Sequence, residues 1–311
     1  MGRLWNDIKG SVSEHNEKKV LSMQQVKEIQ QILLMMLEDI DSICREYRLT
    51  YVLIGGTAIG SIRHKGFIPW DDDVDVAMPR KDYEKFVRII NEEWKEKYYL
   101  TDSIRNNNYG KVIPKLRLKG TIYKTVLDIN PEDVQMKADI FIIENVCDNI
   151  ILCQIQGFIC TSMGFLLSCR RLSENKEYFS NFYKGKDFAV KTFIGKLISF
   201  ISLEKWANWT ERCYSLCKNE KSKFVTLPSD GLHFFKGKIR REVICKVIEG
   251  DFEGKKLYLP KEYDFYLKRI YGDYMEIPPE DKRMLSIYSE ISYGKYKDYV
   301  EEKMFQIKGE K

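Results

Sequence analysis

The amino-acid sequence predicts a mixed α/β (α+β) protein whose second half is largely helical. Three observations carry this prediction. The first half alternates between apolar positions at helical spacing and short runs with the two-residue periodicity of strands. The second half contains two long apolar segments, residues 150–169 and 187–209. The composition, 44% hydrophobic and 31% charged over 311 residues, is that of a folded chain with a real core and excludes a disordered one.

Each element of the first half is expected from its local pattern. The first helix has apolar side chains at three- and four-residue spacing, and proline punctuates the loop before the second strand and ends that strand. The expected elements are a helix at 23–47, a strand at 51–54, a short helix at 57–63, a strand at 73–78, a helix at 81–94, and strands at 98–103, 111–118 and 138–143.

The two long apolar segments of the second half each allow two interpretations. Residues 150–169 approach the length of a membrane span, but Gln154 and Gln156 interrupt them and favour a buried helix. Residues 187–209 place lysines between apolar clusters and include Trp206 and Trp209. They are expected to form either an amphipathic helix on a membrane surface or an ordinary packed helix.

Charge and cysteine content exclude some classes of protein. The net charge of +5 is a mild bias that fits an anionic substrate or membrane surface and is too weak to indicate DNA binding. The eight cysteines contain no CxxC pair and the three histidines are scattered, so a zinc site is not expected.

The N-terminus lacks the apolar core of a secretory signal, which predicts a cytoplasmic protein with reduced cysteines.

The acidic run at the second strand is the first chemical signal. In a strand, Asp73 and Asp75 share one face, while Val74 and Val76 point to the other face and the core. Two carboxylates so close repel each other unless a cation lies between them, and a hard divalent ion such as Mg²⁺ suits oxygen ligands. The alternative is a solvated acidic strand end. Asp71, two residues before Asp73, would fall on the same face, but it lies in the loop before the strand. We therefore expect at most a substrate-orienting role for it.

A third carboxylate and a glycine pair complete the expected site. Asp139 is the only acid within an apolar strand, where it needs either a metal or a salt bridge to a basic side chain. Gly55 and Gly56 follow a strand and let the backbone approach a ligand, and the helix that opens at Thr57 directs its N-terminus toward a phosphate.

Basic residues near these motifs are candidates for charge neutralisation. Arg63 and Lys65 lie between the glycines and the acidic strand, and Lys115 and Arg117 alternate on a later strand. Their alternative interpretation is a solvated run of charge.

The segment GGTAIGSIRHKGFIPWDDDVDVAMPRKDYEKF resembles the LicD family of bacterial phosphocholine transferases, which is related to fukutin and fukutin-related protein. A second similar stretch contains Tyr263-Asp264, Tyr271-Gly272-Asp273-Tyr274 and Pro278-Pro279. The resemblance spans about residues 25–285 and is loose over 150–255. It implies a nucleotidyltransferase-type fold with a mixed sheet, in which Asp73 and Asp75 form the DxD pair and Asp139 the third acid. The paired histidines found near the end of many members are missing here, which leaves the acceptor undefined.

The resemblance also implies a domain plan. It comprises an N-terminal extension at 1–20, a nucleotidyltransferase-like catalytic core at 21–147, a helical region at 148–285 that completes the LicD-like domain, and a charged tail at 286–311.

By the same resemblance, the expected activity is transfer of a phospho-alcohol from a CDP-activated donor, most simply phosphocholine from CDP-choline, with release of CMP. Mg²⁺, or Mn²⁺ in its place, bound by Asp73, Asp75 and Asp139 is the expected cofactor. The expected acceptor is a cell-surface glycan (lipopolysaccharide, teichoic acid or capsule) or its lipid-linked precursor. The protein is expected to bind it as a peripheral protein at the cytoplasmic face of the membrane. Trp70, Tyr271 and Tyr274 are candidates to contact a choline ammonium, with core packing as the alternative.

The alternatives within enzymes are a ribitol- or glycerol-phosphate transferase and an enzyme that transfers the nucleotide itself. A non-catalytic binding protein is disfavoured by the three acids, and nucleic-acid binding by the lack of a basic–aromatic patch.

Overall fold

The computed structural model describes residues 19–106, 109–125, 128, 134–180, 185–283 and 285–309. Contacts divide the chain into two compact units. The unit that contains the first helix, named here the α2 unit, comprises described residues of 19–100, Lys115–Ile140 and 243–309. The other, the α5 unit, comprises Thr101–Pro114 and Phe141–Glu242. Most of the predicted N-terminal extension lies outside the described residues.

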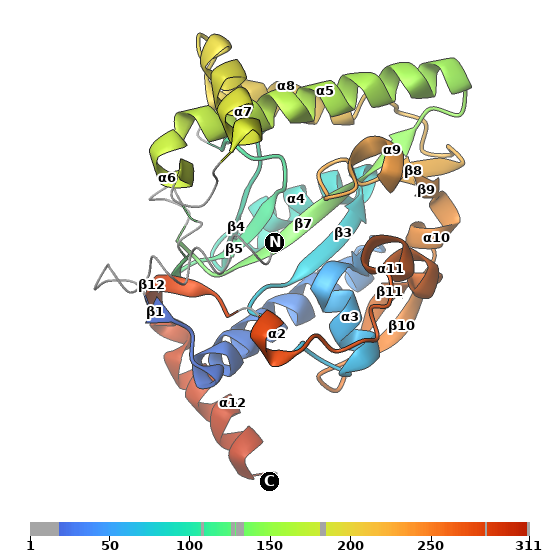
Figure 1. The fold of residues 1–311 in the computed structure, drawn as a ribbon. Helices are drawn as coiled ribbons and strands as arrows, with labels where there is room; N and C mark the ends of the chain where they lie inside the picture. Colours follow the sequence, from blue (N-terminus) through green and yellow to red (C-terminus); the bar gives the residue numbers. More distant parts are fainter. Residues whose placement is uncertain are drawn as a thin grey trace. The chain divides into compact units, whose positions relative to one another are not determined.

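The α2 unit is built from a sheet with flanking helices (Figure 1). Its strands are β1 (Lys19–Val20), β2 (Val52–Leu53), β3 (Asp75–Pro79), β4 (Tyr98–Thr101), β5 (Lys115–Leu118), β6 (Ile122–Thr125), β10 (Val247–Phe252), β11 (Lys255–Pro260) and β12 (Ile287–Ser292). Its helices are α2 (Met23–Glu46), α3 (Gly55–Arg63), α4 (Arg80–Glu93), α11 (Tyr263–Tyr271), η1 (Glu280–Lys282), η2 (Gly294–Tyr296) and α12 (Lys297–Gly309). The chain passes between the two units at the end of β4, before β5, within β7 (Lys137–Val146) and within α10 (Arg241–Cys245).

The main sheet follows the order β2-β3-β7-β5-β4. Strand β3 is antiparallel to β2, and β5 is antiparallel to β7 with Lys115 opposite Asp139. Val74 and Val76 are fully buried, as the strand pattern predicts, and Ala77 is buried as well. The mixed α/β class is thereby confirmed.

Helix α2 begins where its sequence provides a capping box. The side chain of Ser22 accepts a hydrogen bond from the Gln25 backbone N–H, and the Gln25 side chain accepts one from the Ser22 backbone N–H. One face of the helix, including Val26, Ile29 and Leu33, is buried in the core of the unit. The apolar spacing that predicts this helix therefore also defines its packing face.

Two smaller sheets complete the α2 unit. Strand β12 lies antiparallel between β1 and β6. Strands β10 and β11 form a hairpin whose two turn residues, Glu253 and Gly254, both have positive φ, as a tight two-residue turn requires. The hairpin turn is fixed to the loop after α3, because Glu253 donates its backbone N–H to the carbonyl of Lys65 and accepts the Phe67 N–H on its carboxylate.

The α5 unit is mainly helical. Its elements are α5 (Ile150–Glu174), α6 (Lys176–Ser180), α7 (Lys186–Leu197), α8 (Leu203–Tyr214), β8 (Phe224–Thr226), α9 (His233–Gly237) and β9 (Ile239–Arg240). The end of β7 pairs with β8, and β8 pairs with β9. Helix α5 packs against α7, α8 and α9 (Figure 1), with one core around Cys153, Cys160 and Phe234 and another around Leu167 and Trp206.

Several sequence-based predictions need correction in detail. Helix α3 begins at Gly55 rather than Thr57, and β3 begins at Asp75, so Asp73 lies in the loop before the strand and not within it. Residues 187–209 form two helices, α7 and α8, with a break at 198–202. The second half is helical from α5 to α8, but it also contains strands β8 to β12. The segment 286–311, expected as a charged tail, contains β12 and α12.

The preferred interpretation of residues 150–169 as a buried helix is also wrong. The apolar window of α5 has a mean hydropathy of 1.8, yet only 28% of it is buried. The glutamine that suggested burial is indeed inside, since Gln156 donates to the carbonyl of Asn145 and accepts the N–H of Cys147. The isoleucine and phenylalanine side chains of the same helix instead face outward.

Candidate active site

The acidic loop before β3 lies against the N-terminus of α3. A Cβ atom on Gly55 would stand 2.8 Å from Asp75 Oδ2, and one on Gly56 would stand 2.6 Å from Asp71 Oδ2. Gly55 also has φ +58°, a left-handed conformation that glycine tolerates best. The two glycines therefore provide the space that these carboxylates occupy.

Thr57 joins the two elements directly. Its hydroxyl accepts a hydrogen bond of 2.9 Å from the backbone N–H of Asp75, and the Ile54 N–H bonds to the Asp75 carbonyl. The residue at the N-cap of α3, Ile54, provides no side-chain cap. The first N–H groups of α3 thus have no capping side chain and lie beside the acidic loop, where the positive end of the helix dipole favours anions.

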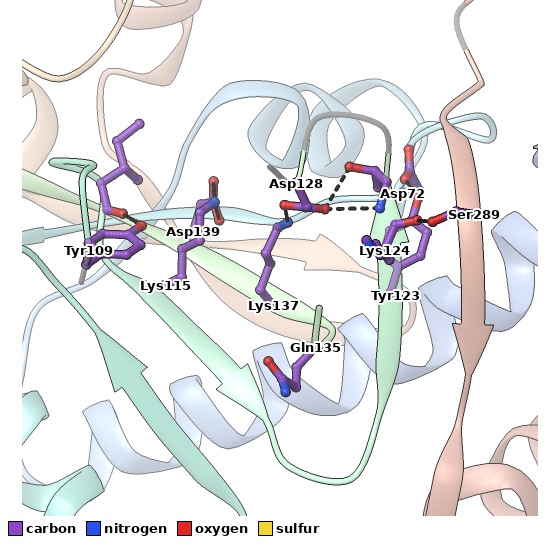
Figure 2. A network of polar contacts seen from close by, with 12 residues as sticks. Asp72, Tyr109, Lys115, Tyr123, Lys124, Asp128, Gln135, Lys137, Asp139 and Ser289 are labelled. Atoms are coloured by element: carbon purple, nitrogen blue, oxygen red, sulfur yellow. Dashed lines mark hydrogen bonds and ion pairs between the residues drawn. The ribbon is translucent and has the colours of Figure 1, made fainter. Parts of the chain in front are cut away.

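The third predicted acid belongs to the same group. The backbone N–H of Asp139 bonds to the carbonyl of Val74, which places β7 beside the acidic loop. The carboxylate of Asp139 forms an ion pair with Lys115, with its two oxygens 2.5 and 2.6 Å from Nζ, and Figure 2 shows this pair across β5 and β7. The salt bridge that was the alternative interpretation of Asp139 is thus present, and the charge of Asp139 also acts on Asp73 and Asp75.

The carboxylates raise one another's pKa. Desolvation first, and then the charges of Asp72 and Asp139, raise the pKa of Asp73 to about 6, against the opposing effects of a hydrogen bond with Asp71 and the charge of Lys115. Desolvation and neighbouring carboxylates also hold the pKa of Asp71 well above its usual range. The pKa of Asp75 is raised for the same reasons.

This acid cluster, defined as Asp71, Asp73, Asp75 and Asp139, fits a hard divalent cation by its donor chemistry. Carboxylate oxygens are the ligands that Mg²⁺ prefers, and a bound cation relieves the repulsion that raises these pKa values. In the described part of the chain no three His, Cys, Asp or Glu side chains are already set in the geometry of a metal site. Lys115 supplies positive charge to the cluster.

Asp72 faces a different set of partners. It accepts hydrogen bonds from Tyr123 on β6 and from the hydroxyl of Ser286, the latter at 2.8 Å. Near it, Lys137 forms an ion pair of 2.9 Å with Asp128 (Figure 2). The middle carboxylate of the DDD run therefore anchors the acidic loop to β6 and to the segment before β12.

The predicted basic residues occupy different settings. Arg63 donates to the main-chain carbonyls of Tyr274 and Glu276, at 2.7 and 2.8 Å, and so holds the segment after α11. Lys65 is exposed, with φ +61°, in the loop fixed by Glu253. Arg117 is fully buried on β5. Of this group, Lys115 contacts the acid cluster through its ion pair with Asp139.

The three aromatic candidates also differ. The Tyr271 hydroxyl would lie 3.6 Å from a Cβ on Gly55, and this side chain is half-exposed beside the cluster. Tyr274 is buried and donates to Asp264. The ring of Trp70 is covered by the Arg283 guanidinium, whose Cζ lies 4.6 Å from the ring centroid.

Sequence reasoning underestimated Asp71 and missed Tyr123. The sequence signal for Asp71 is its two-residue spacing from Asp73, which would place both on one face of a strand. The position of Asp71 in a loop argued against a larger role. No local signal points to Tyr123, since its partner Asp72 is 51 positions away in the chain.

The α2 unit combines a mixed α/β fold with carboxylates beside a glycine-led helix. Residues 48–112 match the family model described as LicD/FKTN/FKRP, nucleotidyltransferase domain. This match, with the relative described next, confirms the resemblance to the LicD family and the prediction that the chain is an enzyme, a transferase. Lys115 and Asp139 lie beyond the matched residues.

Two curated proteins are similar to the chain. One is the lipopolysaccharide cholinephosphotransferase LicD of Haemophilus influenzae, 29% identical over 261 residues that cover 82% of this chain and 93% of that protein. The other is an uncharacterised protein of Rickettsia typhi, 31% identical over 75 residues that cover 24% of this chain and 21% of that protein. The likeness to the first extends well beyond the matched domain.

Proposed function

We propose that this protein is a Mg²⁺-dependent transferase that moves phosphocholine from CDP-choline onto a cell-surface glycan or its lipid-linked precursor and releases CMP. The observation that carries this proposal is the acid cluster set against the glycine-led N-terminus of α3. The likeness to the Haemophilus influenzae enzyme over most of both chains supports phosphocholine and lipopolysaccharide as the group and the acceptor.

In this proposal, Asp73 and Asp75 hold the divalent cation, and Asp71 and Asp139 complete its negative surroundings. The cation, when bound, neutralises charge on the diphosphate of the donor. The N-terminus of α3, with Gly55 and Gly56, presents backbone N–H groups to the phosphate. Phosphoryl transfer depends on how the donor is positioned and on how its charge is neutralised. Loss of Asp73 or Asp75 is therefore expected to abolish transfer, because the cation that binds the donor diphosphate is lost.

Asp139 is the proposed general base. The acceptor hydroxyl gives its proton to the Asp139 carboxylate as its oxygen forms a bond to the phosphorus that bears choline. The bond from that phosphorus to the bridging oxygen breaks, and CMP departs with the electron pair. Lys115 orients the Asp139 carboxylate through their ion pair on neighbouring strands. Its positive charge also stabilises the negative charge that develops on the phosphate oxygens during transfer.

The half-exposed ring of Tyr271 is the aromatic surface proposed to meet the choline ammonium, because it adjoins Gly55. Trp70 is less suited, since a guanidinium already covers its ring. We further propose that the protein acts in the cytoplasm, on the side of the membrane where CDP-activated donors are available.

The test is release of CMP from a panel of CDP-choline, CDP-ribitol, CDP-glycerol and CDP-ethanolamine, with Mg²⁺ and a lipopolysaccharide acceptor extract. We expect CMP from CDP-choline, with choline retained on the acceptor, and no CMP from Asp73→Asn or in the presence of chelator. If CMP were released only from CDP-ribitol or only from CDP-glycerol, the transferred group would be ribitol phosphate or glycerol phosphate and not phosphocholine. Pyrophosphate release from nucleoside triphosphates, without CMP from any donor, would contradict the proposal in favour of nucleotide transfer.

A further inference from the structure

The α5 unit turns large apolar side chains toward solvent on two of its helices. On α5, Ile151, Ile155, Phe158 and Phe165 recur at three-, four- and seven-residue spacing, and Phe158 is 71% exposed. They share the outer face of the helix, where Thr161 and Ser162 separate Phe158 from Phe165. Its buried face instead carries small and polar side chains, including Cys153, Gln156, Gly157 and Cys160. The usual arrangement of a surface helix is the reverse.

Helix α7 has the same inverted arrangement. Its buried positions are Thr192 and Gly195, whereas Val190, Phe193 and Leu197 lie one or two turns apart on the outer face. Phe193 and Leu197 are 63% and 61% exposed, and Phe200, just after the helix, is 82% exposed. Isolated exposed apolar residues are ordinary, but aligned rows on two packed helices indicate a surface that meets an apolar partner.

The two rows face the same way. The row on α5 continues, at the same helical spacing, to Cys169 and Ser173. These two residues lie under Gly195, where an added Cβ would stand 2.0 Å from the Cys169 carbonyl oxygen and 2.6 Å from Ser173 Cβ. Helix α7 therefore packs on α5 (Figure 1) on the side of the α5 row. Its own row lies on the helix face opposite its buried residues, Thr192 and Gly195, and so faces away from α5.

The charges around these rows fit an anionic surface. Lys186 and Lys196 are exposed on α7, the helix that carries Val190, Phe193 and Leu197, and Asp187 is its exposed acidic residue. Residues 150–214 contain nine basic and five acidic residues, and the first twenty residues of α5 contain no charged residue. An apolar stripe edged by lysines is the pattern of a helix that lies in the headgroup region of an anionic bilayer.

The packing of α5 distinguishes lying on a membrane from crossing it. Although α5 has the length and hydropathy of a span, it packs along α8, which carries Glu204, Lys205, Glu211 and Arg212 within twelve residues. If α5 crossed the bilayer, the charged side chains of α8 would lie in hydrocarbon at a large cost. We propose that the outer faces of α5 and α7 form a membrane-docking surface that lies in the interface of an anionic bilayer without spanning it.

This proposal rests on the surface of the α5 unit and not on the proposed reaction. The experiment is co-sedimentation of the full chain with vesicles of phosphatidylcholine mixed with phosphatidylglycerol, compared with pure phosphatidylcholine. We expect the wild type to bind the anionic vesicles more tightly. The triple variant Phe193→Ser, Leu197→Ser, Phe200→Ser should bind at least about tenfold more weakly, because three apolar side chains no longer leave water. Lys186→Glu with Lys196→Glu should remove the preference for phosphatidylglycerol.

The matched control is Phe305→Ser on α12, which removes an equally exposed phenylalanine (77%) from the α2 unit and should leave vesicle binding unchanged. Ile155→Ser with Phe158→Ser tests the α5 row independently, and circular dichroism checks that each variant is folded. Release of CMP from CDP-choline without vesicles should be unchanged in the triple variant, so failure of docking and failure of the proposed reaction are distinguishable.

Three results would overturn the proposal. The first is no binding of the wild type to anionic vesicles. The second is a change of molecular mass in solution in the triple variant, with vesicle binding intact, which would assign the surface to a second copy of the chain. The third is resistance of membrane-bound protein to alkaline carbonate extraction, which would show a spanning helix.

Discussion

Replacement of Asp73 by asparagine is expected to stabilise the metal-free fold while it abolishes transfer. The raised pKa of Asp73 means that its ionised form is disfavoured in the folded state by desolvation and by the charges of Asp72 and Asp139. Asparagine has the same shape, carries no charge and can still hydrogen-bond to Asp71. The substitution thus removes a like charge from the acid cluster and, with it, an expected cation ligand.

The magnitude follows from the pKa difference. A shift from 3.8 to about 6 corresponds to about 3 kcal/mol at about 1.4 kcal/mol per pKa unit. The Asp73 side chain is open to solvent on one side, and solvent screening reduces this to about 1–2 kcal/mol. The folded-state pKa lies above the unfolded one, so the folded state binds the extra proton between about pH 4 and pH 6. Wild-type stability therefore falls as pH rises through this window.

The assay is urea unfolding of wild type and Asp73→Asn in chelator, at pH 4.5 and pH 7.5. The free energy of unfolding of the variant should exceed that of wild type by about 1–2 kcal/mol at pH 7.5, and by clearly less at pH 4.5. A variant less stable than wild type at pH 7.5, or a gain independent of pH, would show that desolvation and the neighbouring carboxylates do not raise the pKa of Asp73. CMP release measured in parallel should be lost.

Three further outcomes are expected. Mg²⁺ should raise the melting temperature of wild type more at pH 7.5 than at pH 5, because protons compete for Asp73 below a pKa of about 6, and Asp73→Asn should show little shift; an equal shift in both proteins would refute this. Gly56→Ala should lower turnover at least about tenfold, since the new Cβ would stand 2.6 Å from Asp71 Oδ2, whereas Gly231→Ala, with nothing within 4 Å, should not. Arg63→Ala should lower the free energy of urea unfolding by about 1–3 kcal/mol, as two main-chain carbonyls lose a charged donor; unchanged unfolding would leave Arg63 free for a substrate role.

Patterns of short range were predictable from the sequence. Helix α2 was predicted over its whole length, because apolar spacing is a local property. The glycine pair, the acidic run and the isolated Asp139 were recognised as chemically unusual for the same reason. The starts of α3 and β3 were misplaced by two residues, since the hydrogen bonds of Ile54 and Asp139 decide where regular structure begins.

Contacts between distant parts of the chain were not predictable. Lys115 was expected to neutralise substrate charge, and the register of β5 on β7 places it opposite Asp139. Arg63 has the same kind of charge and lies nearer to the acidic run in sequence, yet it holds main-chain carbonyls after α11. Sequence spacing does not specify strand register, and register decides which charges meet.

The sequence by itself determined the class of fold, the acid and glycine residues of the candidate site and the presence of two long apolar segments. Only the tertiary structure decided that Asp71 joins the acid cluster, that Asp72 anchors its loop, and that the apolar faces of α5 and α7 remain exposed. The physical reason is that periodicity records which side chains share a face of an element. What covers that face depends on the packing of elements far apart in the chain.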